Sequence, residues 1–287
     1  MQTFKTLLLR EWMQHRFGWL LLGSVPFVIM VPLMSFGTIQ FGDGSPPPPG
    51  MVALIVAMGY IFLLLVLAGG AVAIQAPGLA RRDRQDRSIE FWLSLPVGHA
   101  QAIGATLLMH LLAMPLLLLG LAAAGSPVAG LIAEARVHGV ASLAQIPWAM
   151  VGAVFVAGIA RLALGLVLAA LWLSPLLLGA MAASAWLKRW GVPALAAVLG
   201  LGGLILAKGY DQPIVLDLIG SLFRNAARAV APMVLDDKAP PALADLPGML
   251  GHDALGALSD LASPLFAGGV LVAAGCFALL VWRRNQD

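Results

Sequence analysis

The chain has 287 residues, of which 60% are hydrophobic and only 11% are charged, and its formal net charge is +3. Soluble domains carry about 25% charged residues, so this composition, with a mean hydropathy of +0.92, excludes a soluble globular protein and predicts an all-α integral membrane protein. The basic residues form clusters beside apolar runs, a pattern typical of membrane topology and not of a nucleic-acid-binding surface.

The first sixteen residues precede the first apolar run and have an amphipathic pattern, because apolar side chains recur every fourth position from Met1 to Trp12. We expect residues 1–16 to form a helix on the cytoplasmic membrane surface, with a simple topology anchor as the alternative. A cleavable signal peptide is not expected, because no small-residue cleavage site follows the apolar run. The residues assigned to this interface helix are Phe4, Leu8, Arg10, Glu11 and Trp12.

Six apolar runs reach or approach the roughly 20 residues that a membrane-spanning helix needs. Basic residues precede the first run, separate the second from the third, and follow the fourth and the last, so all of them would share one side of the membrane. By the positive-inside bias that side is cytoplasmic. We therefore expect a multi-pass protein of the bacterial inner (plasma) membrane with both termini cytoplasmic. The predicted spans are 17–39, 50–75, 100–124, 164–187, 192–207 and 264–282.

The fourth span lies in an apolar run, 147–187, that is too long for one simple crossing. Two spans with a turn near Ser174 and Pro175 would place Lys188 outside, so we favour one span from about Leu164. Arg161 and Lys188, 27 positions apart, would then be separated by about 40 Å, close to the thickness of a bilayer with its headgroups. Residues 147–160 would form an interfacial or re-entrant helix, and Pro175 would kink the span.

The segment 208–263 is the one sizeable region between predicted spans, and we expect it to be an extracytoplasmic helical segment. Its first part predicts an amphipathic helix with Leu218 and Leu222 on one face and Asp217 and Arg224 on the other. After a break at 236–241, a second apolar stripe predicts another helix. The two helices would lie in or dip into the outer interface, or else form a small external cap.

The loop between the second and third spans, 80–99, mixes four arginines with three acidic residues over ten positions. Ser88 is a suitable N-cap for a short helix that Pro96 would end. Phe91 and Trp92 would project from this helix beside the charges, as anchors do at a protein-docking site. The alternative is a positive-inside loop whose aromatic residues lie among the lipid headgroups.

With its interface helix, the DRSIEFWLSLPV stretch and the helical insertion before the last span, the chain resembles the permease subunits of ABC-2 type transporters. The resemblance covers the whole chain in layout and residues 84–97 in detail. It implies that the 80–99 loop holds a coupling helix that fits a groove of a separate P-loop ATPase. The coupling residues by this resemblance are Arg84, Asp86, Arg87, Ser88, Glu90, Phe91, Trp92, Leu95 and Pro96.

Absent motifs agree with this interpretation. The sequence has no GxxxxGK[ST], HExxH, GxSxG or CxxC motif, so we expect no enzyme activity and no bound cofactor, with ATP and Mg²⁺ held by the partner ATPase. No Asp or Glu lies inside the six predicted spans, whereas ion-driven carriers place carboxylates near the midplane. His110, in the third span, is either a proton relay or a histidine bonded to a neighbouring helix.

The sequence thus predicts a six-span permease, an exporter by its resemblance, that pairs with a second permease, most simply as a homodimer, and binds two ATPase subunits. Its other partners would be membrane lipids and a substrate that the sequence does not identify, and no nucleic acid. The main alternative is a non-transporting membrane scaffold or assembly factor. A membrane-embedded enzyme would have to rely on the polar residues His252, Asp253 and Asp260.

Overall fold

The computed structural model describes residues 2–37, 46–80, 98–231 and 242–286. Every regular element in these ranges is helical, which confirms the all-α prediction. Five stretches are long and apolar enough to cross a membrane, so the multi-pass membrane character is also confirmed, while a six-span arrangement stays a prediction. The five candidate spans are Phe4–Phe36, Met51–Leu79, His99–His138, Trp148–Gly209 and Pro264–Asn285.

Helix α1 (Gln2–Phe36) is continuous, so the predicted interface helix 1–16 forms its first four turns and not a separate element. No proline or turn signal interrupts the sequence before Pro26, and the helix therefore runs straight on into the apolar run. Leu8 and Trp12 pack against a buried cluster that includes Trp19 and Met109. These two predicted interface residues face other parts of the protein.

The second and third candidate spans form a closely packed pair. Helix α2 (Met51–Leu79) lies along α6 (Met114–His138), which continues α5 (His99–Leu108) through a π-helical turn, η1 (Met109–Ala113). The π turn is explained by Pro115, which has no N–H and whose ring would clash with the preceding turn of a regular α-helix. Gly130 allows α2 to approach, because a Cβ there would overlap the backbone oxygen of Ala53.

Helix α7 (Trp148–Leu187) is also a single helix, which corrects the expectation that 147–160 forms a separate helix. The start of the membrane span near Leu164 stays a prediction. Pro175 lies within this helix, and the chain reverses only at Lys188, where φ is 54°. The sequence between 148 and 163 is apolar apart from Arg161, so nothing in it ends a helix. Arg161 consequently lies inside α7, and its contacts are described below.

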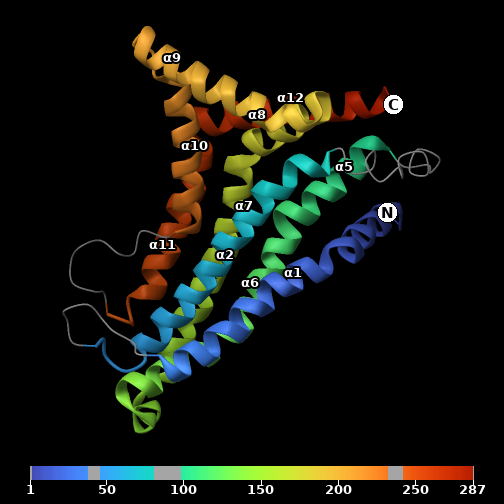
Figure 1. Ribbon diagram of the computed structural model, residues 1–287. Helices are drawn as coiled ribbons and strands as arrows, with labels where there is room; N and C mark the ends of the chain where they lie inside the picture. Colours follow the sequence, from blue (N-terminus) through green and yellow to red (C-terminus); the bar gives the residue numbers. More distant parts are fainter. Residues whose placement is uncertain (1, 38–45, 81–97, 232–241, 287) are drawn as a thin grey trace.

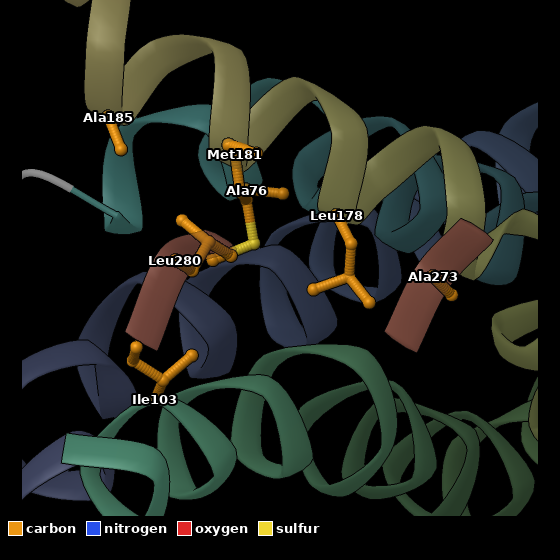
Figure 2. Packing of buried hydrophobic residues seen from close by; sticks show 8 residues of the cluster. Ala76, Ile103, Leu178, Met181, Ala185, Ala273 and Leu280 are labelled. Carbon is orange, nitrogen blue, oxygen red and sulfur yellow. The ribbon is translucent and has the colours of Figure 1, made fainter. Parts of the chain in front are cut away.

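One end of the bundle gathers the ends of four elements, and we call it the basic end. Ala76 of α2, Ile103 of α5, Ala185 of α7 and Leu280 of α12 (Pro264–Asn285) share one hydrophobic cluster there (Figure 2). Lys188 and Arg283 follow within a few residues, and both chain termini lie at the same end (Figure 1). The basic residues that flank these candidate spans thus share one end, as the charge pattern predicts, whereas Arg136 and Arg161 lie elsewhere in the bundle. The side of the membrane that the basic end faces stays a prediction.

The region after α7 differs from the predicted order of spans. After η3 (Lys188–Trp190), α8 (Gly191–Ala196), η4 (Ala197–Leu201) and α9 (Gly202–Gly209) run across the basic end and away from the bundle (Figure 1). Predicted span 192–207 lies in this stretch. It is apolar all round, and such a pattern does not distinguish a helix that crosses the bundle from one that lies across its end.

Helix α10 (Ile214–Val230) starts beside α9, where Leu216 contacts Gly203, and packs along α7 in the opposite direction. Its Leu222 lies against Trp172, and its Ala229 lies against Gly165. Helix α11 (Leu246–Ser259) and η5 (Asp260–Ala262) then lead into α12, which returns to the basic end. The sequence predicts the segment 208–263 at the end of the bundle opposite the basic residues, but it begins at the basic end.

Candidate functional site

The predicted coupling residues, from Arg84 to Pro96, lie outside the residues that the structure describes. The two points from which their loop extends are described: α2 ends at Leu79, and α5 begins at His99. Both points lie at the basic end, beside the first turns of α1 (Figure 1). The docking prediction therefore stays a prediction.

A group of polar side chains is buried where α1 meets α5 and η1, and we call Arg10, Glu11, His15, Thr106 and His110 the Glu11 cluster. Glu11 is 0% exposed. Its Oε1 accepts a hydrogen bond of 3.1 Å from Thr106 Oγ1 and forms an ion pair with the Arg10 guanidinium. Its other oxygen, Oε2, lies 3.4 Å from His110 Nε2. The carboxylate thus joins two candidate spans.

The two histidines of the Glu11 cluster face each other. His15 follows Glu11 by one helical turn, and its Nδ1 lies 3.1 Å from the Glu11 backbone oxygen and 4.0 Å from Oε2. The rings of His15 and His110 are edge to face, with centroids 4.4 Å apart. Their donor atoms and the Glu11 carboxylate lie within 4.8 Å of one another, the one such group of three found among the described residues.

His110 is 1% exposed, and within the described structure neither of its ring nitrogens has an aligned hydrogen bond. His110 Nε2 is close enough to Glu11 Oε2 for an ion pair, but the two groups are not aligned for a hydrogen bond. The residue belongs to the π turn η1, and such turns are frequent at functional sites. Buried polar groups are nearly always paired, so an imidazole left in this state requires an explanation.

An open pocket of about 450 Å³ lies between α1 and α2 and reaches the Glu11 cluster through His15, which forms part of its wall. Gln14, Gln75 and the backbone at Gly18 and Gly78 add polar lining. Of the cluster residues, His15 lines this pocket, whereas Glu11 and His110 are buried behind it.

A second buried carboxylate, Glu134, lies at the opposite end of the α2–α6 pair and is 0% exposed. Its Oε2 accepts hydrogen bonds from the backbone N–H groups of Gly50 (3.1 Å) and Ala53 (3.2 Å), at the start of α2. His138 Nδ1 lies 2.9 Å from Oε1. A carboxylate satisfies the unpaired N–H groups of a helix N-terminus and is stabilised by the helix dipole, so Glu134 caps α2.

Arg161 is the third buried charge, with 3% of its surface exposed. Its Nε and one terminal nitrogen lie 2.8 and 2.7 Å from Asp253 Oδ2 of α11. The other terminal nitrogen donates to the Ala229 backbone oxygen at 2.6 Å, in the last turn of α10. A cation at a helix C-terminus is favourable. Arg161 therefore fastens α10 and α11 to α7.

Helix α10 has two faces with different surroundings. Leu222, Ala226 and Ala229 are buried against α7, whereas Asp217, Arg224 and Arg228 are exposed on the opposite side. Lipid is a poor solvent for such side chains, which in membrane proteins face a water-filled cavity or another protein surface. A polar surface therefore runs beside α7 along the bundle.

The sequence analysis did not foresee the burial of Glu11 or Glu134, and it placed Arg161 at an interface. A local signal was present, because Glu11 and Glu134 each precede a histidine by four positions and so share a helix face with it. The two interpretations of His110 stay open, but its neighbour is now identified as Glu11. Asp253, which the sequence suggested for an embedded enzyme, instead pairs with Arg161.

No family model, curated protein or solved structure matches the chain, so its function is inferred from its own residues.

Proposed function

We propose that this chain is the membrane-spanning permease subunit of an ATP-driven transporter of the ABC-2 type, acting as an exporter. The observation that carries the proposal is α10, which packs along α7 with Asp217, Arg224 and Arg228 exposed on its free face. A transport path needs polar groups beside the spanning helices, shielded from lipid. Pairing of two copies across this face would enclose such a path.

Energy would come from a separate P-loop ATPase that docks on the 80–99 loop. This loop extends from α2 and α5 at the basic end. Because α5, η1 and α6 form one continuous helix and α2 packs along it, a pull on the loop would move both as rigid bodies. Glu11 and Thr106 would transfer the motion to α1.

The exposed residues on and beside the free face of α10 suggest a class of substrate. Leu218 and Phe223 are exposed near the charged side chains of Arg224 and Arg228. A surface that presents both apolar and cationic groups suits an amphipathic substrate with an anionic or polar head.

The test is docking. The full chain is purified from its own cells as wild type and as Phe91→Ala/Trp92→Ala, and the bound P-loop ATPase is quantified by mass spectrometry and by Mg²⁺-dependent ATP hydrolysis. We expect at least a tenfold loss of the ATPase, because aromatic anchors at an interface each contribute about 2 kcal/mol or more. Trp190→Ala is the matched control, since Trp190 is an exposed aromatic residue at the same end. Equal ATPase recovery from both variants would refute the proposal.

An ion-driven carrier is the second candidate, because Glu11 is a buried carboxylate within the candidate span Phe4–Phe36. Buried carboxylates within spans are groups that ion-coupled carriers use. However, Glu11 lies seven positions after Phe4, which places it about 10 Å from the start of this span and not at its middle. Transport into proteoliposomes driven by a proton or sodium gradient, with no ATPase present, would favour this candidate.

A further inference from the structure

We propose that Glu11, His15 and His110 form a binding site for a divalent transition metal ion of the zinc type. The proposal concerns these three residues alone and is independent of the transport function, since metal binding requires neither an ATPase nor a second copy of the chain.

The donor set fits this class of ion. Two imidazole nitrogens and one carboxylate oxygen, with a further position left for water, are ligands that zinc uses in many proteins. Magnesium and calcium prefer oxygen ligands and are not expected here.

The distances are close to those that a metal would impose. Ligand atoms bound tetrahedrally at about 2.0–2.2 Å from zinc lie roughly 3.3–3.5 Å from each other. His110 Nε2 and Glu11 Oε2 are 3.4 Å apart. His15 Nδ1 is 4.0 Å from the same oxygen and 3.1 Å from the Glu11 backbone oxygen, so metal binding would require the His15 ring to rotate and release this backbone contact.

The state of His110 is the second observation that indicates a ligand. Its ring is buried at the centre of the cluster, and neither nitrogen is hydrogen-bonded within the described structure. Leaving a buried polar group unpaired is unfavourable, and a metal ion would occupy one of the two nitrogens. His15, the third ligand, lines the open pocket between α1 and α2.

Neighbouring groups orient the ligands. Arg10 and Thr106 both bind Oε1 of Glu11, and Oε2 is the oxygen that lies near His110 and His15. Such outer partners fix the orientation of metal ligands. The charge on Arg10 opposes a divalent cation, so the site favours ions that bind imidazole strongly, such as Zn²⁺, Co²⁺ and Ni²⁺, over ions held mainly by charge.

The consequence would be a metal clamp between two candidate spans. Glu11 and His15 belong to α1, and His110 belongs to η1, within the third candidate span. A bound ion would hold the first turns of α1 against η1 near the basic end, in addition to the hydrogen bond from Thr106 to Glu11.

The experiment uses the full chain in detergent, purified with an affinity tag that contains no histidine, stripped with EDTA and titrated with Zn²⁺ and Co²⁺. We expect one ion per chain and the visible absorption bands of tetrahedral cobalt. His110→Ala and Glu11→Gln should weaken binding at least about 100-fold, because even outer partners of metal sites contribute 10–100-fold.

The chain supplies a matched control in Glu134 and His138, which have the same spacing but only one imidazole. His138→Ala should leave zinc affinity unchanged. The buried variants could lose zinc binding because they misfold. His15 lies at the edge of the open pocket and is only partly buried, so His15→Ala should fold normally and still weaken zinc binding. Absence of stoichiometric binding, or equal affinity in His15→Ala, His110→Ala and His138→Ala, would overturn the proposal.

Discussion

Glu11 and Glu134 are both fully buried, and each has a histidine one turn further along its own helix, yet their surroundings differ. Glu134 meets the backbone N–H groups of Gly50 and Ala53, so the start of α2 satisfies it. Glu11 meets side chains from two candidate spans. One of these side chains, the His110 imidazole, has no aligned hydrogen bond within the described structure.

This difference separates a structural role from a functional one. A carboxylate that caps a helix N-terminus stabilises the fold and needs no further partner. A carboxylate that faces two imidazoles beside an open pocket has the donor atoms of a ligand site. The two clusters therefore predict opposite responses to mutation and to metal ions.

The largest effect is expected at the cap. Glu134→Ala removes the acceptor of two buried backbone N–H groups and should lower the free energy of unfolding by about 3 kcal/mol. Glu134→Gln keeps an acceptor oxygen and should lose about half as much. Unfolding in detergent with and without EDTA measures both. If the loss depended on metal, the assignment of Glu134 as a cap would be wrong.

Metal removal should change the stability that depends on the Glu11 cluster and not the stability that depends on the Glu134 cap. Zinc at 100 times its Kd should stabilise the wild type by about 2.7 kcal/mol through mass action, and EDTA should abolish this gain. Glu11→Gln should gain little from zinc, whereas Glu134→Gln should gain as much as the wild type. Equal zinc stabilisation of the two variants would remove the distinction between the clusters.

The cap also depends on the close approach of α2 to α6. Gly130→Ala places a Cβ against the Ala53 backbone oxygen, next to the cap, and should cost about 2 kcal/mol through overpacking. Gly120→Ala, on the same helix, meets no neighbour and should be neutral or slightly stabilising. Thermal unfolding compares the two, and similar midpoints would contradict the observed packing.

The smallest effect on stability is expected at the exposed charges of α10. These side chains neither cap a helix nor belong to the Glu11 cluster, and Arg224 donates an exposed hydrogen bond to Ser221. Arg224→Gln and Arg228→Gln should change the free energy of unfolding by less than about 0.5 kcal/mol, as is usual for surface positions. Transport, measured as ATP-dependent export, should nevertheless fall if this face lines the path. Unchanged export with both substitutions combined would exclude α10 from it.

The sequence predicted the long helices well, because apolar runs and the scarcity of charges are local properties. It did not predict that Glu11 is buried, since its partners Thr106 and His110 are about a hundred positions away. Nor did it predict the path of 192–207, because a run that is apolar on every side fits two orientations equally. Pairing between distant segments decided both outcomes.

The interface residues show the same limit. The spacing of Leu8 and Trp12 correctly indicated one face of a helix, but that face packs on a protein cluster and not on lipid. Periodicity identifies a face that must be covered and does not reveal what covers it. The coupling residues from Arg84 to Pro96 lie outside the described ranges, so their role is still a prediction.

The most direct test of the central claim is a photo-crosslinking amino acid placed at Trp92, activated in intact cells and in membranes supplied with MgATP. The proposed function predicts a crosslink to a P-loop ATPase whose yield changes when ATP binds. Crosslinks to lipid alone would contradict it. Labelling of a cysteine placed at position 92 by a membrane-impermeant reagent added outside the cell would also contradict it.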